Sequence, residues 1–407
     1  MSSVNFLEKL LDGMTVEWLP LGNLAEIYGG LTGKSKSDFE QGNANYITYK
    51  NIFSNIEINP DVFEKVKISP SEKQHKVQYG DILFTGSSEI ANEAGISSAV
   101  TTKFDEEVYL NSFSFGVRFK SNANITPEFS KYLFRCSFMR LEISKTASGV
   151  TRFNISKERF KKILIPVLCP DNPKKSLEIQ AEIVRILDAM TAHTAELTAE
   201  LTAELTARKK QYNYYRDKLL SFEDGEVEWK TLVDVIKTIK TGKLNANAMV
   251  DNGNYPFFTC DSKPFRIDTY AFDTEAIIVS GNGSQVGHIN YYKGKFNAYQ
   301  RTYILADCIE EIKIKFLLIY LKAYLRPYIM QHSKKGSVPY ITLPMLQSFK
   351  VPLPSLEKQI HIISVLEKFE VLTESLFEGL PREIELRQKQ YAYYRDLLLS
   401  FPQAQAA

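Results

Sequence analysis

The sequence has no long hydrophobic run, few cysteines and almost no net charge, and each absence excludes a class of protein. No stretch of about 18 apolar residues occurs, which excludes a transmembrane helix. Residues 1–13 carry acidic side chains and lack the apolar core of a secretory signal. The four cysteines form no CxxC pair, which is typical of reduced thiols in a cytosolic protein. Lys plus Arg number 50 against 48 Asp plus Glu, so the net charge of +2 excludes a polycation but not a local basic face.

Motifs for catalysis are also absent. The five histidines are scattered without metal-ligand spacing. Neither a GxGxxG nor the Asn/Asp-Pro-Pro-aromatic tetrapeptide of an amino-methyltransferase occurs. Residues 29–35 (GGLTGKS) resemble a P-loop, but position 28 is Tyr, so the required first glycine is missing. We therefore expect no metal site, no catalytic residue and no bound cofactor in this chain. Because many Asp and Glu residues are present, the missing motifs do not by themselves exclude a nuclease site.

What the sequence does contain is an internal repeat. Residues 210–222 (KQYNYYRDKLLSF) match residues 389–401 (KQYAYYRDLLLSF) at eleven of thirteen positions, with an offset of 179. A second repeat relates VEW at 16–18 to VEW at 227–229. The chain is thus two tandem units, each a variable region followed by a repeated helical region. Because the N-terminus supplies the VEW segment that would follow the C-terminal helix, the repeat is circular, which predicts that the termini meet and that a pseudo-twofold axis relates the units.

The two repeated helical regions share one hydrophobic pattern. Residues 177–222 contain neither Gly nor Pro, and apolar positions recur at alternating steps of four and three, as in a coiled coil. The same pattern recurs 179 residues later, so we predict that the two regions pack against each other as long antiparallel helices. The alternative is that each packs separately on its own domain. The predicted seam and spacer include Leu187, Leu197, Leu201, Leu205, Tyr212, Tyr215, Leu366, Leu376, Leu380, Ile384, Tyr391 and Tyr394.

Two local features interrupt this pattern. Gly379 and Pro381 predict a kink or break in the second helical region. In the first, the tetrapeptide TAEL occurs three times between 194 and 205, and it adds one extra four-residue step to the seam. TAEL is a good helix-forming sequence, and its copy number could also set the distance between the two ends of the helix.

The variable regions combine strand, turn and helix signals, which predicts two related α/β (mixed α+β) domains. Short strands are expected at 46–49, 81–84, 111–118, 276–279 and 298–304, and helices at 127–145 and 313–330. The resulting boundaries are an N-terminal segment at 1–16, a first domain at 17–170, a central helical region at 171–227, a second domain at 228–354 and a C-terminal helical region at 355–407.

Each variable region ends in a basic segment. Residues 131–162 hold nine Lys or Arg and two acids, and residues 312–350 hold seven and none, so each segment has a net charge of +7. Such segments can neutralise phosphates, while Arg, Asn and Ser can bond base edges. A solvated helix face is the alternative for either segment alone. Loop position and residue type give these candidate DNA contacts: Lys34, Lys36, Ser148, Thr151, Arg152, Asn154, Lys243, Asn282, Ser284, Arg301, Lys334, Lys335 and Ser337.

Together the circular repeat, the TAEL array and the paired KQYxYYRDxLLSF ends resemble the specificity subunit of type I restriction–modification enzymes, in the subfamily with a TAEL-repeat spacer. The segment SGVTRFNIS at 148–156, followed by Ile165-Pro166, is similar to the end of a target recognition domain. The second unit keeps Gly336 and the segments 340–342 and 351–354 but lacks the Thr-Arg pair.

This resemblance implies a non-catalytic, DNA-binding subunit in the bacterial cytoplasm, part of a defence system. Each domain would read one half of a bipartite, asymmetric site in double-stranded DNA, and the helices would set the spacing. Two methyltransferase subunits would bind S-adenosylmethionine and methylate adenine at N6. Two motor-nuclease subunits would add ATP- and Mg2+-dependent translocation and cleavage.

Two other interpretations stay open from the sequence. One is a non-catalytic scaffold with a central coiled coil, whose basic segments bind protein partners. The other is a single-chain nuclease or methyltransferase, which the missing motifs disfavour.

Overall fold

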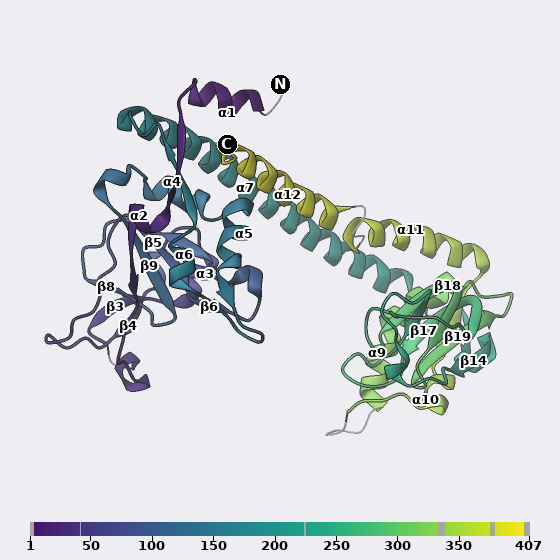
Figure 1. Ribbon diagram of the computed structural model, residues 1–407. Helices are drawn as coiled ribbons and strands as arrows, with labels where there is room; N and C mark the ends of the chain where they lie inside the picture. Colours follow the sequence, from purple (N-terminus) through teal and green to yellow (C-terminus); the bar gives the residue numbers. More distant parts are fainter. Residues whose placement is uncertain (1–3, 41, 224, 333–337, 375–378, 403–407) are drawn as a thin grey trace. The chain divides into compact units, whose positions relative to one another are not determined.

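The computed structural model describes residues 4–40, 42–223, 225–332, 338–374 and 379–402 (Figure 1). The chain forms two compact units, the first comprising Met1–Glu200 with Ile384–Ala407 and the second Leu201–Glu383. The first unit therefore contains both ends of the sequence, as the circular repeat predicts. None of the described helices is long and apolar enough to cross a membrane.

The first unit is built on short sheets around one buried strand. The main sheet has the order β2-β9-β5-β7, and β5 is buried along its whole length because its Ile-Leu-Phe core contacts layers on both faces. Two three-stranded sheets, β4-β3-β8 and β10-β11-β6, and the pair β1-β12 complete it. The strands are β1 Val16–Pro20, β2 Ala25–Gly29, β3 Ala44–Ile47, β4 Glu64–Val66, β5 Asp81–Thr85, β6 Ser87–Ser88, β7 Ser97–Ala99, β8 Val108–Leu110, β9 Ser114–Phe119, β10 Ala147–Ser148, β11 Phe153–Ile155 and β12 Leu164–Leu168.

Short helices connect and cover these strands. They are α1 Val4–Leu11, α2 Leu21–Leu24, α3 Tyr49–Ser54, α4 Pro127–Leu133, α5 Ser137–Lys145 and α6 Lys157–Phe160. The predicted strand at 46–49 ends early, because the Thr48 hydroxyl accepts a hydrogen bond from the backbone N–H of Asn51 and starts α3. The single helix predicted at 127–145 is two helices, α4 and α5.

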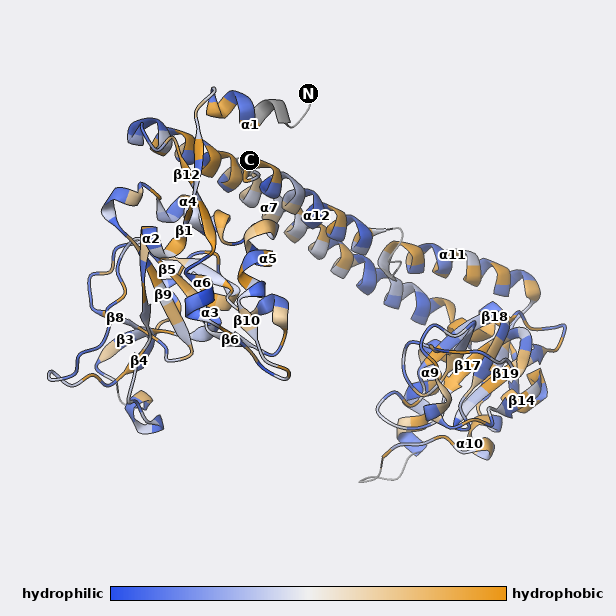
Figure 2. Cartoon of the chain, in the orientation of Figure 1, coloured by the Kyte–Doolittle hydropathy of each residue, from blue (hydrophilic) through white to orange (hydrophobic). Residues whose placement is uncertain are grey.

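The second unit has one larger sheet, in the order β14-β19-β17-β18-β15-β16, and the pair β13-β20. Its strands are β13 Glu228–Thr231, β14 Ile236–Thr241, β15 Tyr255–Phe258, β16 Phe265–Ile267, β17 Phe272–Ser280, β18 Ile289–Ala298, β19 Thr302–Cys308 and β20 Lys350–Leu353. Its helices within the variable region are α8 Leu232–Val235, α9 Ile314–His332 and α10 Leu343–Gln347. Hydrophobic residues concentrate in β17 and β19, as in β5 and β9 of the first unit (Figure 2).

The repeated VEW segments occupy equivalent strands. Trp18 of β1 lies opposite Pro166 of β12, and Trp229 of β13 lies opposite Pro352 of β20. Both pairs are antiparallel. The sequence repeat therefore corresponds to a structural repeat.

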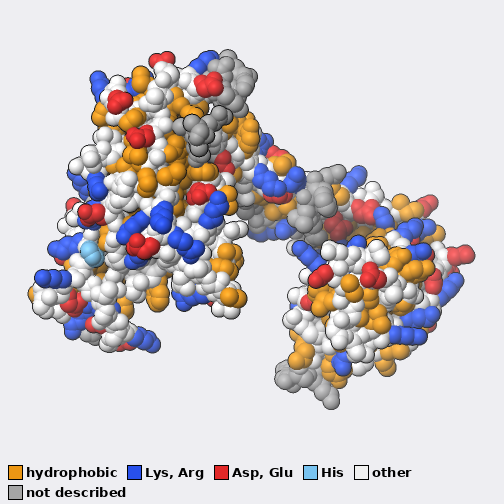
Figure 3. All heavy atoms as spheres, in the orientation of Figure 1, with side chains coloured by type: hydrophobic (Ala, Val, Ile, Leu, Met, Phe, Trp, Pro, Cys, Tyr) orange, Lys and Arg blue, Asp and Glu red, His pale blue; other side chains and the backbone are white. Residues whose placement is uncertain are grey.

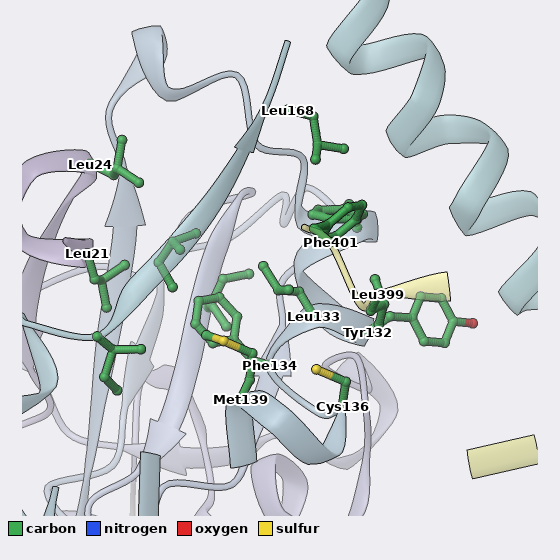
Figure 4. Close-up of a cluster of buried hydrophobic side chains, with 14 of the residues drawn as sticks. Leu21, Leu24, Tyr132, Leu133, Phe134, Cys136, Met139, Leu168, Leu399 and Phe401 are labelled. Carbon is green, nitrogen blue, oxygen red and sulfur yellow. The ribbon is translucent and has the colours of Figure 1, made fainter. Parts of the chain in front are cut away.

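In the first unit, the C-terminal helix packs into the same hydrophobic core as the central helix. Helix α7 (Pro173–Leu219) contributes Ile183 and Leu187 to a core that also holds Leu398 of α12 (Leu380–Leu398). Figure 4 shows Leu399 and Phe401 beside Tyr132 and Leu133 in this core. The indole N–H of Trp18 donates to the carbonyl of Pro402 over 2.9 Å, so β1 and the C-terminal end of the described chain are in direct contact.

In the second unit, the C-terminal part of α7 runs antiparallel to α11 (Leu356–Glu374). The ring of Tyr215 stacks on Phe369 with centroids 5.7 Å apart, and the Lys358 ammonium lies 4.9 Å from the Phe222 ring centre. Residue numbers thus rise along α7 as they fall along α11. Within the first unit, Thr191 of α7 bonds Tyr391 of α12 over 2.9 Å. These contacts confirm the predicted antiparallel helix pairing and, with the α/β units, the predicted fold class.

The break predicted at Gly379 and Pro381 is also confirmed, because α11 and α12 are separate helices. Gly379 has φ +83°, and a Cβ there would lie 2.6 Å from the carbonyl oxygen of Val371. Pro381 occupies the first turn of α12, where its missing N–H costs no helix hydrogen bond.

Most predicted seam residues are at least partly covered. Leu187, Leu366 and Leu380 are buried, Leu197, Leu201, Leu205, Tyr212, Ile384 and Tyr391 are half-buried, and Tyr215 and Tyr394 are more exposed. Leu376 lies outside the described residues.

Candidate nucleic-acid interface

Three backbone segments meet at the end of β5 in the first unit. The N–H of Gly86 donates to the carbonyl of Phe113 over 2.8 Å, and the carbonyl of Gly86 accepts from Ile155 of β11 over 2.9 Å. A Cβ on residue 86 would lie 2.7 Å from the Phe113 oxygen, so this crossing requires glycine. The loop after β5, the turn before β9 and the β10–β11 hairpin are thereby fixed to one another.

The hairpin carries four of the predicted DNA contacts. Ser148, Thr151, Arg152 and Asn154 are all exposed, and Val150 at the tip is 91% exposed. The tip is tight, because Gly149 has φ +141° and a Cβ there would lie 1.9 Å from the carbonyl oxygen of Arg152. The hairpin therefore holds these side chains on a fixed backbone.

Arg152 borders a surface cavity. Its Nε donates to the Ser87 hydroxyl over 3.0 Å, and its guanidinium carbon lies 5.8 Å from the ring centre of Phe113. The cavity has a volume of about 460 Å³ and is lined by Tyr49, Phe53, Ser87, Ser88, Glu89, Ile90, Glu93, Phe113 and Arg152. Phe113 is 61% exposed, an apolar surface open to a ligand.

The second unit has the same backbone arrangement. The N–H of Gly281, which follows β17, donates to the carbonyl of Arg301 over 2.9 Å, and the carbonyl of Gly281 accepts from Ile341 over 2.7 Å. A Cβ on residue 281 would lie 2.2 Å from the Arg301 oxygen. Gly281, Arg301 and Ile341 thus correspond to Gly86, Phe113 and Ile155.

Four predicted DNA contacts of the second unit lie at this crossing. Asn282 pairs with Tyr340, and Ser284 follows in the same exposed loop. Lys243 is exposed and precedes Leu244, which pairs with Tyr299 in the turn that carries Arg301. The remaining three candidates, Lys334, Lys335 and Ser337, lie outside the described residues.

Lys34 and Lys36 occupy the loop after β2, and their surroundings differ. The Lys34 side chain is 6% exposed, and its Nζ lies 2.5 Å from the Glu72 carboxylate and 2.5 Å from the carbonyl of Lys67. The hydrogen bond from Lys34 lowers the pKa of Glu72 to about 2, so this carboxylate is charged at neutral pH. Lys36 is exposed.

The basic segment of the first unit exposes less positive charge at its surface than its sequence composition suggests. Lys131 pairs with Asp188 over 2.9 Å, Arg135 donates to backbone carbonyls including that of Ser97, and Arg140 to those of residues 92, 94 and 95. Burial lowers the pKa of Arg135 to about 10, and that of Arg140 equally. The two arginines thereby hold backbone segments in place, and Lys131 is engaged in an ion pair.

The basic segment of the second unit is likewise partly neutralised. Lys315 pairs with Glu367 over 2.7 Å and Lys322 with Glu370 over 2.5 Å, both on α11. Figure 3 accordingly shows Lys and Arg side chains interspersed with Asp and Glu on the visible face of each unit.

Ser87, Phe113 and Tyr49 are cavity residues that sequence reasoning missed. The Tyr49 hydroxyl donates to the carbonyl of Ser87 over 2.8 Å, which adds α3 to the crossing. No local pattern marks these residues, because they come from separate segments that the hydrogen bonds of Gly86 and Tyr49 bring together.

Comparison with known proteins gives consistent matches over the whole chain. The family model described as type I restriction modification DNA specificity domain matches residues 15–207 and 225–386. The type I restriction enzyme EcoR124I/EcoR124II specificity subunit of Escherichia coli is 35% identical over 430 residues, covering 99% of this chain and 98% of that protein. The EcoprrI specificity subunit of the same species is 34% identical, covering 93% of each chain.

Solved structures match the fold. A structure from work on complex assembly and conformational transition of the type I R-M system is 17% identical, with TM-score 0.68 and coverage of 94% of this chain and 97% of that chain. The HsdS subunit from Thermoanaerobacter tengcongensis is also 17% identical, with TM-score 0.53 and coverage of 94% and 95%.

Proposed function

Because this chain belongs to the family of type I restriction–modification specificity subunits, we propose that each of its two units reads one half of a bipartite, asymmetric site in double-stranded DNA. As a specificity subunit, the chain is a non-catalytic part of a restriction–modification complex. It would supply the sequence selectivity, while its partners perform the chemistry.

The observation that carries this proposal is the repeated crossing with different side chains. Gly86 and Gly281 make matching hydrogen bonds, yet the turn residue is Phe113 in one unit and Arg301 in the other. Equal backbones hold different recognition groups in place. Such a protein reads two unlike half-sites, and the combined target is not palindromic.

The helices would set the gap between the half-sites. Helix α7 is continuous for 47 residues and includes all three TAEL copies. A continuous helix transmits a fixed rise of about 1.5 Å per residue. Its length would therefore fix the number of base pairs between the half-sites.

The helices would also bind two methyltransferase subunits. The repeated YYRD segments present matching exposed surfaces, since Tyr214 is 61% and Tyr393 59% exposed, each against the next tyrosine with centroids 5.4 Å apart. In each, the following Arg pairs with its neighbouring Asp, over 2.7 Å and 2.8 Å. Two equal surfaces can take the same partner twice.

In the assembled complex, the methyltransferase subunits would hold S-adenosylmethionine and methylate one adenine per half-site at N6. Two motor-nuclease subunits would bind ATP and Mg2+ and cleave unmethylated DNA. The complex would act in the bacterial cytoplasm, where it meets incoming DNA.

Long-read methylation mapping tests the proposal. Cells carrying this chain and its methyltransferase partner should show adenine methylation at one bipartite motif with two unlike halves. Cells carrying the methyltransferase alone should not. Methylation without sequence preference, or none in either strain, would instead favour a protein-binding scaffold.

A further inference from the structure

The cavity beside Arg152 combines chemical groups that suit a base pair. Arg152 offers donors, because Nε is bound to Ser87 and no other described residue accepts a hydrogen bond or forms an ion pair with its guanidinium. The two Nη groups are therefore available to a ligand. Glu89 and Glu93 line the same cavity and offer acceptors.

The two carboxylates argue against a phosphate as the ligand. A phosphate would be repelled by Glu89 and Glu93, whereas a neutral ligand with both acceptors and donors would satisfy all three side chains. The aromatic lining from Tyr49, Phe53 and Phe113 also offers apolar contacts to the edge of a base pair.

In the major groove, a G·C pair presents this pattern. Guanine offers the O6 and N7 acceptors that Arg binds with two donors, and the paired cytosine offers an N4 donor that Glu accepts. A T·A or A·T pair has only one acceptor on each base edge beside the adenine N6 donor, so it cannot pair with both Nη groups of Arg152 in the same way.

We propose that this cavity receives the major-groove edge of one G·C pair in the half-site read by the first unit, and that Arg152 is the specificity-determining residue. This inference rests on the proposed function and identifies the residue that contacts the DNA base. Ser87 and Phe113 are positioning residues: the Ser87 hydroxyl holds Nε, and the Phe113 ring supports the guanidinium from one side.

The matching site of the second unit carries the cation at a different position. Strand pairing aligns Asn154 with Ser87 and Tyr340 with Asn282, so Arg152 corresponds to Val338 and Phe113 to Arg301. The arginine side chain therefore lies on the hairpin in the first unit and on the turn in the second unit. Arg301 would contact a different point along the groove and read a different position of its half-site.

Methylation mapping of variants in the complete complex tests this inference. Arg152→Ala should relax one G·C position of one half-site, with discrimination falling about tenfold or more, and leave the other half-site unchanged. Arg152→Lys keeps the charge but loses the bidentate hydrogen bonding, so it should relax the base preference at the same position. Arg301→Ala should relax one position in the other half-site only.

Arg159→Ala is the matched control, because Arg159 is an exposed arginine of α6 in the same basic segment. A phosphate contact of that kind would lower methylation of all sites by one common factor and leave the motif intact. Thermal melting of each variant checks that it folds, and Arg152→Lys serves if Arg152→Ala does not.

The outcomes separate the two proposals. If the wild-type complex methylates without sequence preference, the proposed function fails. If the wild type is selective but Arg152→Lys and Arg152→Ala keep every base preference within about twofold, the base contact is overturned while the proposed function stands. A relaxed position that is A·T in the wild-type motif would also overturn it.

Discussion

Gln180 and Gln359, which are 179 residues apart, make two matching hydrogen bonds in the two units. The Oε1 of Gln180 accepts from the N–H of Thr126 over 3.0 Å, and that of Gln359 accepts from Lys313 over 2.8 Å. Each Nε2 donates to a backbone carbonyl, of Asn124 over 2.6 Å or of Glu311 over 2.8 Å. Each glutamine therefore binds its repeated helix to the segment just before α4 or α9.

We expect Gln359→Leu to destabilise the chain by about 3 kcal/mol, because the N–H of Lys313 and the carbonyls of Glu311 and Pro354 lose their partner. Gln180→Leu should cost a similar amount. Urea unfolding followed by circular dichroism measures both. The substitution Gln285→Leu, at an exposed position, is the control. An equal free energy of unfolding for Gln359→Leu and this control would contradict the stabilising role of the glutamine hydrogen bonds.

Deleting residues 198–201, one TAEL copy, should shorten the gap between the half-sites by about one or two base pairs. The reason is that four residues of helix span about 6 Å and one base pair about 3.4 Å. Both half-site sequences should be unchanged. Methylation mapping reads the gap and the bases together, and altered half-site bases would refute the spacer role.

Tyr214→Ala and Tyr393→Ala should each lower the number of bound methyltransferase subunits from two to one, and the double variant should bind none. Each removes a half-exposed aromatic ring from one of two matching surfaces, and such rings dominate the binding energy of interfaces. Light scattering of the purified complex gives the stoichiometry. Tyr270→Ala, an exposed tyrosine outside the helices, is the control.

Phe401→Ala should destabilise the first unit by about 3–5 kcal/mol, the usual cost of removing a buried phenylalanine. Phe401 is buried, and its ring centre lies 6.1 Å from that of Phe129. Thermal unfolding monitored by tryptophan fluorescence reports the change through Trp18, since the Trp18 indole bonds the adjacent Pro402. The more exposed Phe265→Ala should leave the transition in place.

Thiol labelling should distinguish the native from the unfolded chain in alkaline solution. Burial raises the pKa of the Cys136 thiol to about 11, and burial with nearby Glu275 and Asp307 raises that of Cys308 to about 11. In the unfolded chain both ionise near pH 8.5, so their contribution to stability is full below that pH and falls as the pH rises towards 11.

At pH 9, iodoacetamide should therefore modify Cys136 and Cys308 slowly in the native chain and rapidly in urea. Peptide mass spectrometry locates the modified thiols. Equal rates in the two states would show that the native thiols are accessible and ionised.

The repeat and the helices could be read from the sequence because they depend on local patterns. The match of residues 210–222 to 389–401, the seam periodicity and the Gly379–Pro381 break act within a few helical turns, and the helix pair and the break follow from them. The surface charge of the basic segments, by contrast, could not be read from the sequence. Composition counts Lys131, Arg135 and Arg140 as surface cations, whereas the structure pairs Lys131 with Asp188 and directs both arginines to backbone carbonyls.

The sequence by itself determined that the chain is two circularly arranged units with paired helices, because periodicity and identity carry that information. Only the tertiary structure decided which side chains share a cavity. Tyr49, Ser87, Phe113 and Arg152 come from four segments, and the hydrogen bonds of one glycine, Gly86, help to bring their backbones together. A backbone crossing of this kind depends on long-range pairing and leaves no periodic trace in the sequence.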